Sequence, residues 1–194
     1  MSIRSLLFTA LIRFSPRTKV HGVELAAPTG VAGPEELFRK AGQALELLSS
    51  TAPRLLRRTQ RYLNRIVFVS GGGEVYHERL GAYLVDLPTF QSRSIREVAS
   101  AIVHETVHAR LVRWGIQYDA KRRDDIERVC VNEEIAFLAR LPESGEVIAT
   151  KRESLKTRWW TKQELHQRRL AQLRAHGIPQ AFIRLYDWLR GAVR

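Results

Sequence analysis

Two histidines and a glutamate lie close together in the sequence, in a spacing that suits metal chemistry. His104 and His108 are four residues apart, and Glu105 directly follows the first histidine. Residues at i and i+4 of a helix project from one face, so both imidazole rings can bind the same zinc ion. The glutamate can then accept a proton from a metal-activated water as the resulting hydroxide attacks a carbonyl. The pattern predicts a zinc-dependent hydrolase with Glu105 as the general base, and the alternative is two ordinary histidines on a helix.

A catalytic zinc ion normally has three protein ligands and one open position, so a third ligand is required. No third histidine follows at close spacing, but the next expected helix carries three glutamates. At about 100° per residue, Glu127 and Glu134 lie near the apolar side of that helix, whereas Glu133 lies on its flank. Buried carboxylates need partners, and a metal ion with its histidines would supply them. Helix geometry therefore favours Glu127 and Glu134 and does not separate the two.

This arrangement, a two-histidine motif followed by a glutamate on the next helix, resembles the gluzincin metallopeptidases of the thermolysin and aminopeptidase N type. Eighteen residues separate His108 from Glu127, which is similar to the spacing in the aminopeptidase branch. Residues 131–136 also resemble the asparagine-glutamate-x-x-alanine stretch in which that branch places its ligand, and this cue favours Glu133. We predict Glu127 as the third zinc ligand, with Glu134 as the second choice and Glu133 as the third.

The resemblance covers about residues 65–141 and implies a minimal zincin-like fold whose substrate is a peptide or protein. In that fold an extended peptide binds at a strand edge beside the active-site helix, and residues 82–87 would supply this edge. The family also uses a tyrosine or histidine to stabilise the oxyanion. Tyr118 is the predicted group here, followed by His77 and Tyr83.

The elements that position these residues follow from their periodicity and end signals. Ser94 and Glu97 form a capping box that starts a helix ending near residue 114, so both histidines lie within it. Asp124 and Asp125 favour the start of the next helix, which ends near residue 141. The remaining expected elements are helices at about 5–14, 34–48, 53–62, 162–175 and 179–189, and strands at about 65–69, 74–78 and 82–87.

These elements predict an α+β fold in which a small, mostly antiparallel sheet packs on the two ligand helices. Residues 1–34 are expected to form a partly irregular N-terminal segment that includes a long loop. Residues 35–145 form the zincin-like catalytic core of this prediction. Residues 146–194 form a basic helical extension packed on that core.

Composition and charge limit which other classes of protein and site are compatible with the sequence. A single cysteine, Cys130, excludes an intrachain disulfide and a cysteine-only zinc site. We expect it to be a small buried hydrophobic residue, and the alternative, a thiolate ligand, would be unusual beside two histidines and one carboxylate. No apolar run is long enough to span a bilayer, so we expect a soluble, cytoplasmic protein. The net charge of +12 lies mainly on either side of the mildly acidic residues 66–150, for example in the five arginines of residues 54–65. These flanks keep open an alternative: a protein that binds nucleic acid or an acidic partner, with a structural metal or none.

Overall fold

The computed structural model describes residues 12, 14–28, 33–69, 74–119, 121–158, 160, 170 and 180, and all structural statements concern these residues. The chain divides into two compact units, Met1–Arg152 and Glu153–Arg194. The first unit contains the sheet and the helices that carry the histidines and glutamates. The helices expected at 5–14, 162–175 and 179–189 lie almost wholly outside the described residues. The packing of the C-terminal extension therefore stays a prediction.

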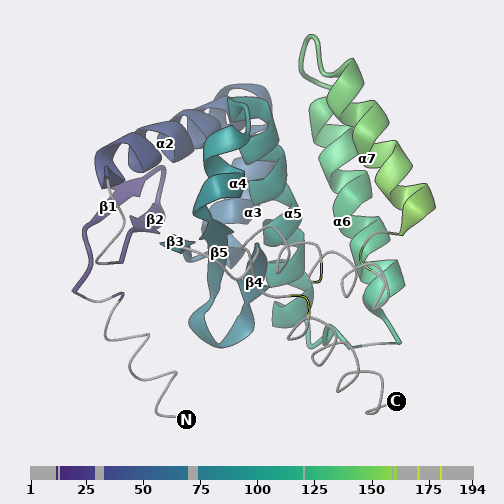
Figure 1. Cartoon of the computed structure of the whole chain (residues 1–194), viewed down its shortest axis with the longest axis horizontal. Coiled ribbons are helices and arrows are strands. Elements are labelled where there is room, and N and C mark those ends of the chain that lie inside the picture. Colours follow the sequence, from purple (N-terminus) through teal and green to yellow (C-terminus); the bar gives the residue numbers. More distant parts are fainter. Residues whose placement is uncertain are drawn as a thin grey trace. The chain divides into compact units, whose positions relative to one another are not determined.

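Five strands form one mixed sheet in the order β1-β2-β3-β5-β4 (Figure 1). The antiparallel pairs are β1 (Arg17–Val20) with β2 (Val23–Ala26), and β4 (Val75–His77) with β5 (Ala82–Asp86). The central strand β3 (Arg65–Val69) runs parallel to both β2 and β5. The predicted α+β class is confirmed, and the sheet is larger than expected and as parallel as it is antiparallel.

The β1–β2 hairpin lies where the sequence predicts a loop. His21 and Gly22 have φ values of +48° and +81°, and two positive φ angles are what a two-residue type I′ hairpin turn requires. The strands on either side are only four residues long. Strands this short carry too little periodic signal to stand out between the neighbouring prolines and glycines. They become a stable part of the fold because β2 pairs with β3, about forty residues later.

The strand predicted to offer its edge to a peptide, residues 82–87, is an interior strand. Most of it forms β5, which pairs with β3 on one side and with β4 on the other. Its backbone groups are therefore already used, and the prediction of this strand as the open edge was wrong. Among the described strands, the open edge next to β5 belongs to β4.

The helices that cover the sheet begin with clear local signals. Prolines occupy the first turn of α2 (Pro34–Thr51) and of α3 (Pro53–Tyr62), where a missing N–H costs nothing. The short helix α4 (Leu87–Ser92) is capped by the Asp86 carboxylate, which accepts a hydrogen bond from the Thr89 N–H. Helices α6 (Arg123–Leu138) and α7 (Gly145–Thr157) follow later in the chain. Of these, α4 and α7 were not predicted.

Helix α5 (Ile95–Arg113) is the central element of the first unit. Its predicted capping box is confirmed, because the Ser94 hydroxyl accepts from the Glu97 N–H while the Glu97 carboxylate accepts from the Ser94 N–H. The helix packs against α2, α3, α6 and the edge strand β4. Twelve of its nineteen residues are buried, including both residues of the pair His104 and Glu105. Any site on α5 is thus surrounded by closely packed elements.

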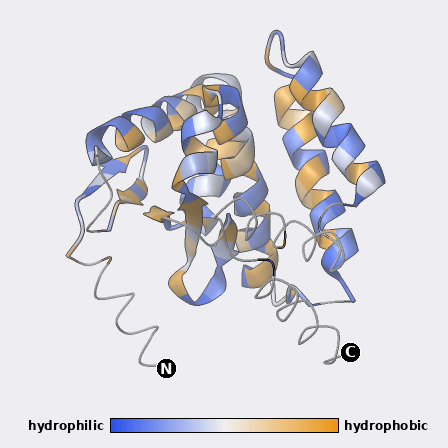
Figure 2. Cartoon of the chain, viewed as in Figure 1, coloured by the Kyte–Doolittle hydropathy of each residue, from blue (hydrophilic) through white to orange (hydrophobic). Residues whose placement is uncertain are grey.

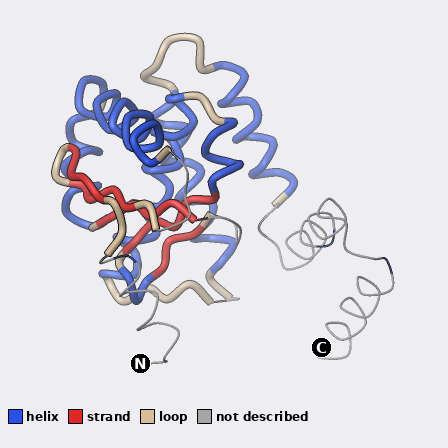
Figure 3. The backbone as a smooth tube through the Cα atoms, turned by 60° about the vertical axis from the view of Figure 1, so that its left-hand side comes forward, coloured by secondary structure: helices blue, strands red, loops and turns tan. Residues whose placement is uncertain are grey.

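The main core lies between the sheet and the helices that cover one of its faces (Figure 3). Phe68 of β3 is at its centre, with the rings of Phe38 and Phe90 at 6.1 and 4.9 Å. The inner strands β2 and β3 consist largely of hydrophobic residues (Figure 2), which suits strands whose side chains are mostly buried on both faces. Among the described residues, no helix combines the length and the apolar character needed to cross a bilayer.

Candidate metal centre

His104 and His108 project from the same face of α5, as their spacing predicts. Their Nε2 atoms are 3.1 Å apart and their ring centroids are 4.9 Å apart. His104 is buried and His108 is half-buried. At this separation, small rotations of the two rings would allow both nitrogens to bind the same metal ion.

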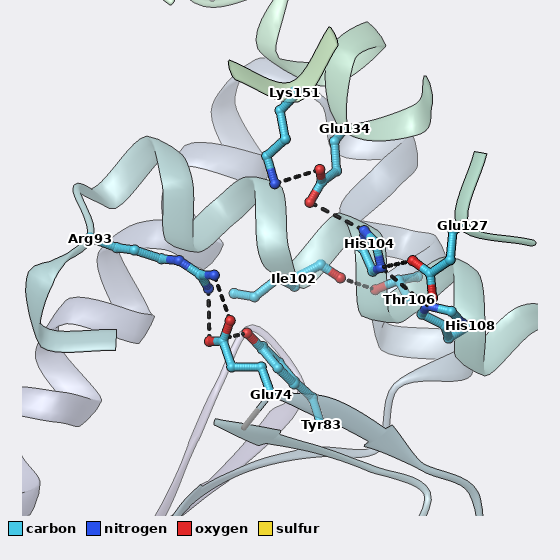
Figure 4. A network of polar contacts seen from close by, with 10 residues as sticks. All are labelled: Glu74, Tyr83, Arg93, Ile102, His104, Thr106, His108, Glu127, Glu134 and Lys151. Carbon is cyan, nitrogen blue, oxygen red and sulfur yellow. Dashed lines mark hydrogen bonds and ion pairs between the residues drawn. The ribbon is translucent and has the colours of Figure 1, made fainter. Parts of the chain in front are cut away.

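Glu127 completes the pair from the neighbouring helix. Its Oε2 atom lies 3.3 Å from Nε2 of His104, and its Oε1 atom lies 3.7 Å from Nε2 of His108 (Figure 4). Glu127 is itself buried, and it comes from the first half of α6, which packs along α5. The structure therefore brings the first-choice glutamate against both histidines.

Glu134 occupies a different place around the same histidine. Its Oε1 atom lies 3.4 Å from Nδ1 of His104, on the side of the ring away from Nε2. Its Oε2 atom forms a 2.6 Å ion pair with Lys151 of α7 (Figure 4). A carboxylate on Nδ1 fixes the tautomer and orientation of a histidine whose Nε2 binds a metal. Glu134, paired with Lys151, thus lies where a residue that positions a metal-binding His104 would lie.

Glu133, the third-choice glutamate, does not lie with the histidines. Its Oε1 atom is 3.5 Å from a guanidinium nitrogen of Arg58 on α3 and 3.5 Å from one of Arg110 on α5. The side chain therefore faces the α3 side of α5. Because it is charged, adjacent to Glu134 and outside the histidine cluster, Glu133 is a matched control position.

Cys130, for which the sequence favours packing over metal binding, lies beside the two histidines. One ligand atom each from His104, His108 and Cys130 lie within 4.8 Å of one another, so these three residues could hold a metal ion. The thiol is fully buried among Val107, Leu111 and Ile126. A signal was available in the sequence, because Cys130 lies three residues after Glu127 and so on the same side of α6.

Glu105 has an unusual environment for a carboxylate. It is only 7% exposed, and its Oε2 atom has no hydrogen-bond partner among the described residues. Burial raises the pKa of Glu105 to about 7, and the charges of Glu127 and Glu74 add to this effect while His104 opposes it. A carboxylate with a pKa near neutrality is suited to accepting and returning a proton.

The two histidines differ in electrostatics. Burial alone would lower the pKa of His104, but the carboxylates of Glu134 and Glu127 outweigh it and raise this pKa to about 10. Burial and the nearby charge of His104 lower the pKa of His108 to about 4. At neutral pH these pKa values keep the His104 ring protonated and the His108 ring neutral, so a cation bound at Nε2 of His104 would displace a proton.

The three candidates for oxyanion stabilisation lie in different places. The Tyr118 hydroxyl donates a hydrogen bond to Oε1 of Glu127, and its ring packs edge-on against His108 at 5.3 Å. Tyr118 is 42% exposed, so it faces both the cluster and solvent. The buried Tyr83 instead donates to Glu74, which is also paired with Arg93 (Figure 4). His77 is half-buried on β4, and its Nδ1 atom has no partner among the described residues.

The role of Glu134 can be tested by Glu134→Gln, which keeps the shape of the side chain and removes its charge. We expect affinity for Zn²⁺ to fall by about 10- to 100-fold, as when an outer-shell partner of a ligating histidine is lost. Competition with a chromophoric chelator measures this affinity. Glu133→Gln is the control and should change it little, and equal effects of the two variants would contradict a positioning role for Glu134.

Comparisons with known protein families, curated proteins and solved structures found no match for this chain. The functional assignment therefore depends on the chemistry of the residues described above.

Proposed function

We propose that this protein is a zinc-dependent hydrolase, and that its substrates are peptides or proteins. The observation that carries the proposal is the position of Glu127, whose carboxylate faces Nε2 of both His104 and His108. Two imidazoles and one carboxylate form the ligand set of a catalytic zinc site. This set also matches the gluzincin metallopeptidases, which the spacing of these residues resembles.

The chemistry of the donors favours zinc among the common divalent cations. Imidazole nitrogens suit zinc and other transition metals, whereas magnesium and calcium prefer sites made of oxygen atoms. In the proposed site, His104, His108 and Glu127 hold the ion, and Glu134 keeps Nε2 of His104 directed toward it. Bound zinc would supply a Lewis acid that polarises a carbonyl and lowers the pKa of water.

Glu105 is the proposed general base. It follows His104 directly on α5, and its charge interacts with those of His104 and Glu127. A buried carboxylate oxygen without a hydrogen-bond partner is costly, and Oε2 of Glu105 has none among the described residues, which supports a chemical role beside the histidines. In this role Glu105 accepts a proton from the attacking water and later returns it to the leaving amine.

Tyr118 is the proposed oxyanion-stabilising group. Its hydroxyl already reaches the Glu127 carboxylate, and its partial exposure leaves the ring free to meet a bound substrate. Donation of its O–H to the developing negative charge on the substrate would stabilise the transition state. Tyr83 is less suited to this task, because it is only 2% exposed and so cannot meet a substrate without a rearrangement of the core.

The proposed peptide site is the open edge of β4. This strand contacts α5, and its outer side has no partner among the described strands. An extended peptide could pair there as an added strand, with main-chain hydrogen bonds supplying affinity for any sequence. This assignment supports peptides over small esters or amides, which would not need a strand edge.

The zinc content of the purified chain after reconstitution tests the proposal. We expect about one zinc ion per chain, measured by elemental analysis, because the donor set describes a single site. Glu127→Gln should lose most of this zinc, and Glu133→Gln should retain it. A chain without zinc would contradict the proposal and favour the nucleic-acid alternative, in which the exposed Arg54, Arg57, Arg58 and Arg61 of α3 contact phosphates.

A further inference from the structure

Among His104, His108 and Cys130, the three residues that could hold a metal ion, Cys130 has no role in the proposed hydrolase. The thiol is 0% exposed, and its sulfur lies within 4.8 Å of a ring nitrogen of both His104 and His108. A buried cysteine is most often a small hydrophobic residue, but such a residue does not need to face two imidazoles. Its position therefore calls for a chemical explanation.

The geometry of α6 gives Cys130 the same access as Glu127. The two residues are one helical turn apart on α6, and both side chains reach the histidine face of α5. A ligand set made of His104, His108, Glu127 and Cys130 would supply four protein donors. Four protein donors are typical of a closed zinc site, whereas a hydrolytic site leaves one position to water.

Independent of the cysteine, the surroundings indicate that a cation belongs here. The Oε2 atom of Glu105 is buried without a partner among the described residues, and its carboxylate interacts electrostatically with His104 and Glu127. Glu127 and Glu134 add two more buried carboxylates around the same imidazole. Buried negative charge of this density is stabilised by a bound cation.

We propose that Cys130 is a fourth metal ligand, whose thiolate occupies in the resting protein the position that water needs for hydrolysis. On binding, the S–H bond breaks, a sulfur–metal bond forms and the proton passes to solvent. The inference depends on the proposed metal site and adds a regulatory property to it. Hydrolysis requires the thiolate to leave, and the thiolate selects zinc, cobalt or cadmium over magnesium and manganese.

Cobalt(II) spectroscopy of the full-length chain tests this ligand directly. Because Cys130 is the only cysteine, any thiolate-to-cobalt charge-transfer band in the near ultraviolet must come from it. We expect this band in the wild-type protein and its loss in Cys130→Ser and Cys130→Ala, with the visible cobalt bands retained. Two variants guard against one of them failing to fold.

Two further measurements support the spectrum. Metal uptake at neutral pH should release about one proton fewer in Cys130→Ser than in the wild type, as measured with a weak indicator buffer. Removal of the thiol should also increase hydrolysis of a peptide library, because the position for water is then open. A decrease in this activity in Cys130→Ser and Cys130→Ala, with the charge-transfer band present in the wild type, would contradict the resting-state block.

The outcomes separate this inference from the proposed function. If cobalt binds and His104→Ala abolishes its visible bands, but the wild type shows no charge-transfer band, Cys130 is not a ligand and the hydrolase proposal stands. If neither cobalt nor zinc binds the wild-type protein, both proposals fail. If the band is present and hydrolysis is absent in every variant, the metal site is closed and structural, so the hydrolase proposal and the resting-state block fail while the ligand assignment stands.

Discussion

Glu105→Gln is expected to reduce peptide hydrolysis by about 100- to 10,000-fold, the range associated with loss of a general base. Glutamine keeps the size of the side chain but cannot accept a proton at neutral pH. The carboxylate it replaces is buried, lacks a partner for Oε2 among the described residues and has a pKa raised to about 7, chiefly by burial. The initial rate on a quenched-fluorescence peptide library, at equal zinc loading, measures the effect.

Two control measurements on Glu105→Gln, its zinc affinity and its melting temperature, test whether the metal site and the fold are unchanged. Zinc affinity should remain within a few fold of the wild-type value, because Glu105 is not one of the proposed ligands. The melting temperature should not decrease, since the change removes a buried charge with an unpartnered oxygen. Undiminished hydrolysis in a zinc-loaded Glu105→Gln protein would refute its role as the general base.

Zinc itself is expected to produce the largest change in stability. At a free concentration about 1,000 times Kd, a ligand that binds only the folded state adds about 4 kcal/mol to the free energy of unfolding. For a chain of 194 residues this corresponds to a rise in Tm of about 8 to 16 °C. The physical reason is that a dication would offset much of the buried negative charge of Glu105, Glu127 and Glu134, in addition to the pairing that His104 and Lys151 supply.

Thermal unfolding with and without zinc measures this stabilisation. Magnesium should have little effect, and His104→Ala should abolish the zinc-dependent shift. The shift should also shrink as pH falls, because the raised pKa of His104 means that zinc competes with a proton for Nε2. An equal shift in Glu127→Gln and in the wild type would contradict the proposed third ligand.

Much of the site could be predicted from the sequence because its signals are local. The capping box of Ser94 and Glu97 set the start of α5, and the i, i+4 spacing put His104 and His108 on one face. Helix periodicity also placed Glu127 and Glu134 on the buried side of α6. The similarity of residues 131–136 to a family stretch favoured Glu133 instead, but that side chain faces Arg58 and Arg110.

The features that could not be predicted depend on contacts between distant segments. The local sequences of β4 and β5 do not indicate which strand lies at the edge of the sheet, because this depends on how β5 pairs with β3. The short hairpin of β1 and β2 is stabilised by a strand about forty residues away. The partner of Glu134 is Lys151 on α7, a helix whose pattern gave no signal. The position of Cys130 beside both histidines was not predicted, because its residue type suggested packing rather than chemistry.

The proposed ligands are contributed by two helices rather than one, which gives the ion a mechanical role as well as a chemical one. His104 and His108 lie on α5, and Glu127 and Cys130 lie on α6. A metal held by both helices is a reversible cross-link, equivalent in effect to a disulfide that closes the connection between them. Closing a loop of about twenty residues restricts the unfolded chain and tethers both ends of the segment that carries Tyr118. Metal binding would thus restrict the range of positions that Tyr118 can adopt.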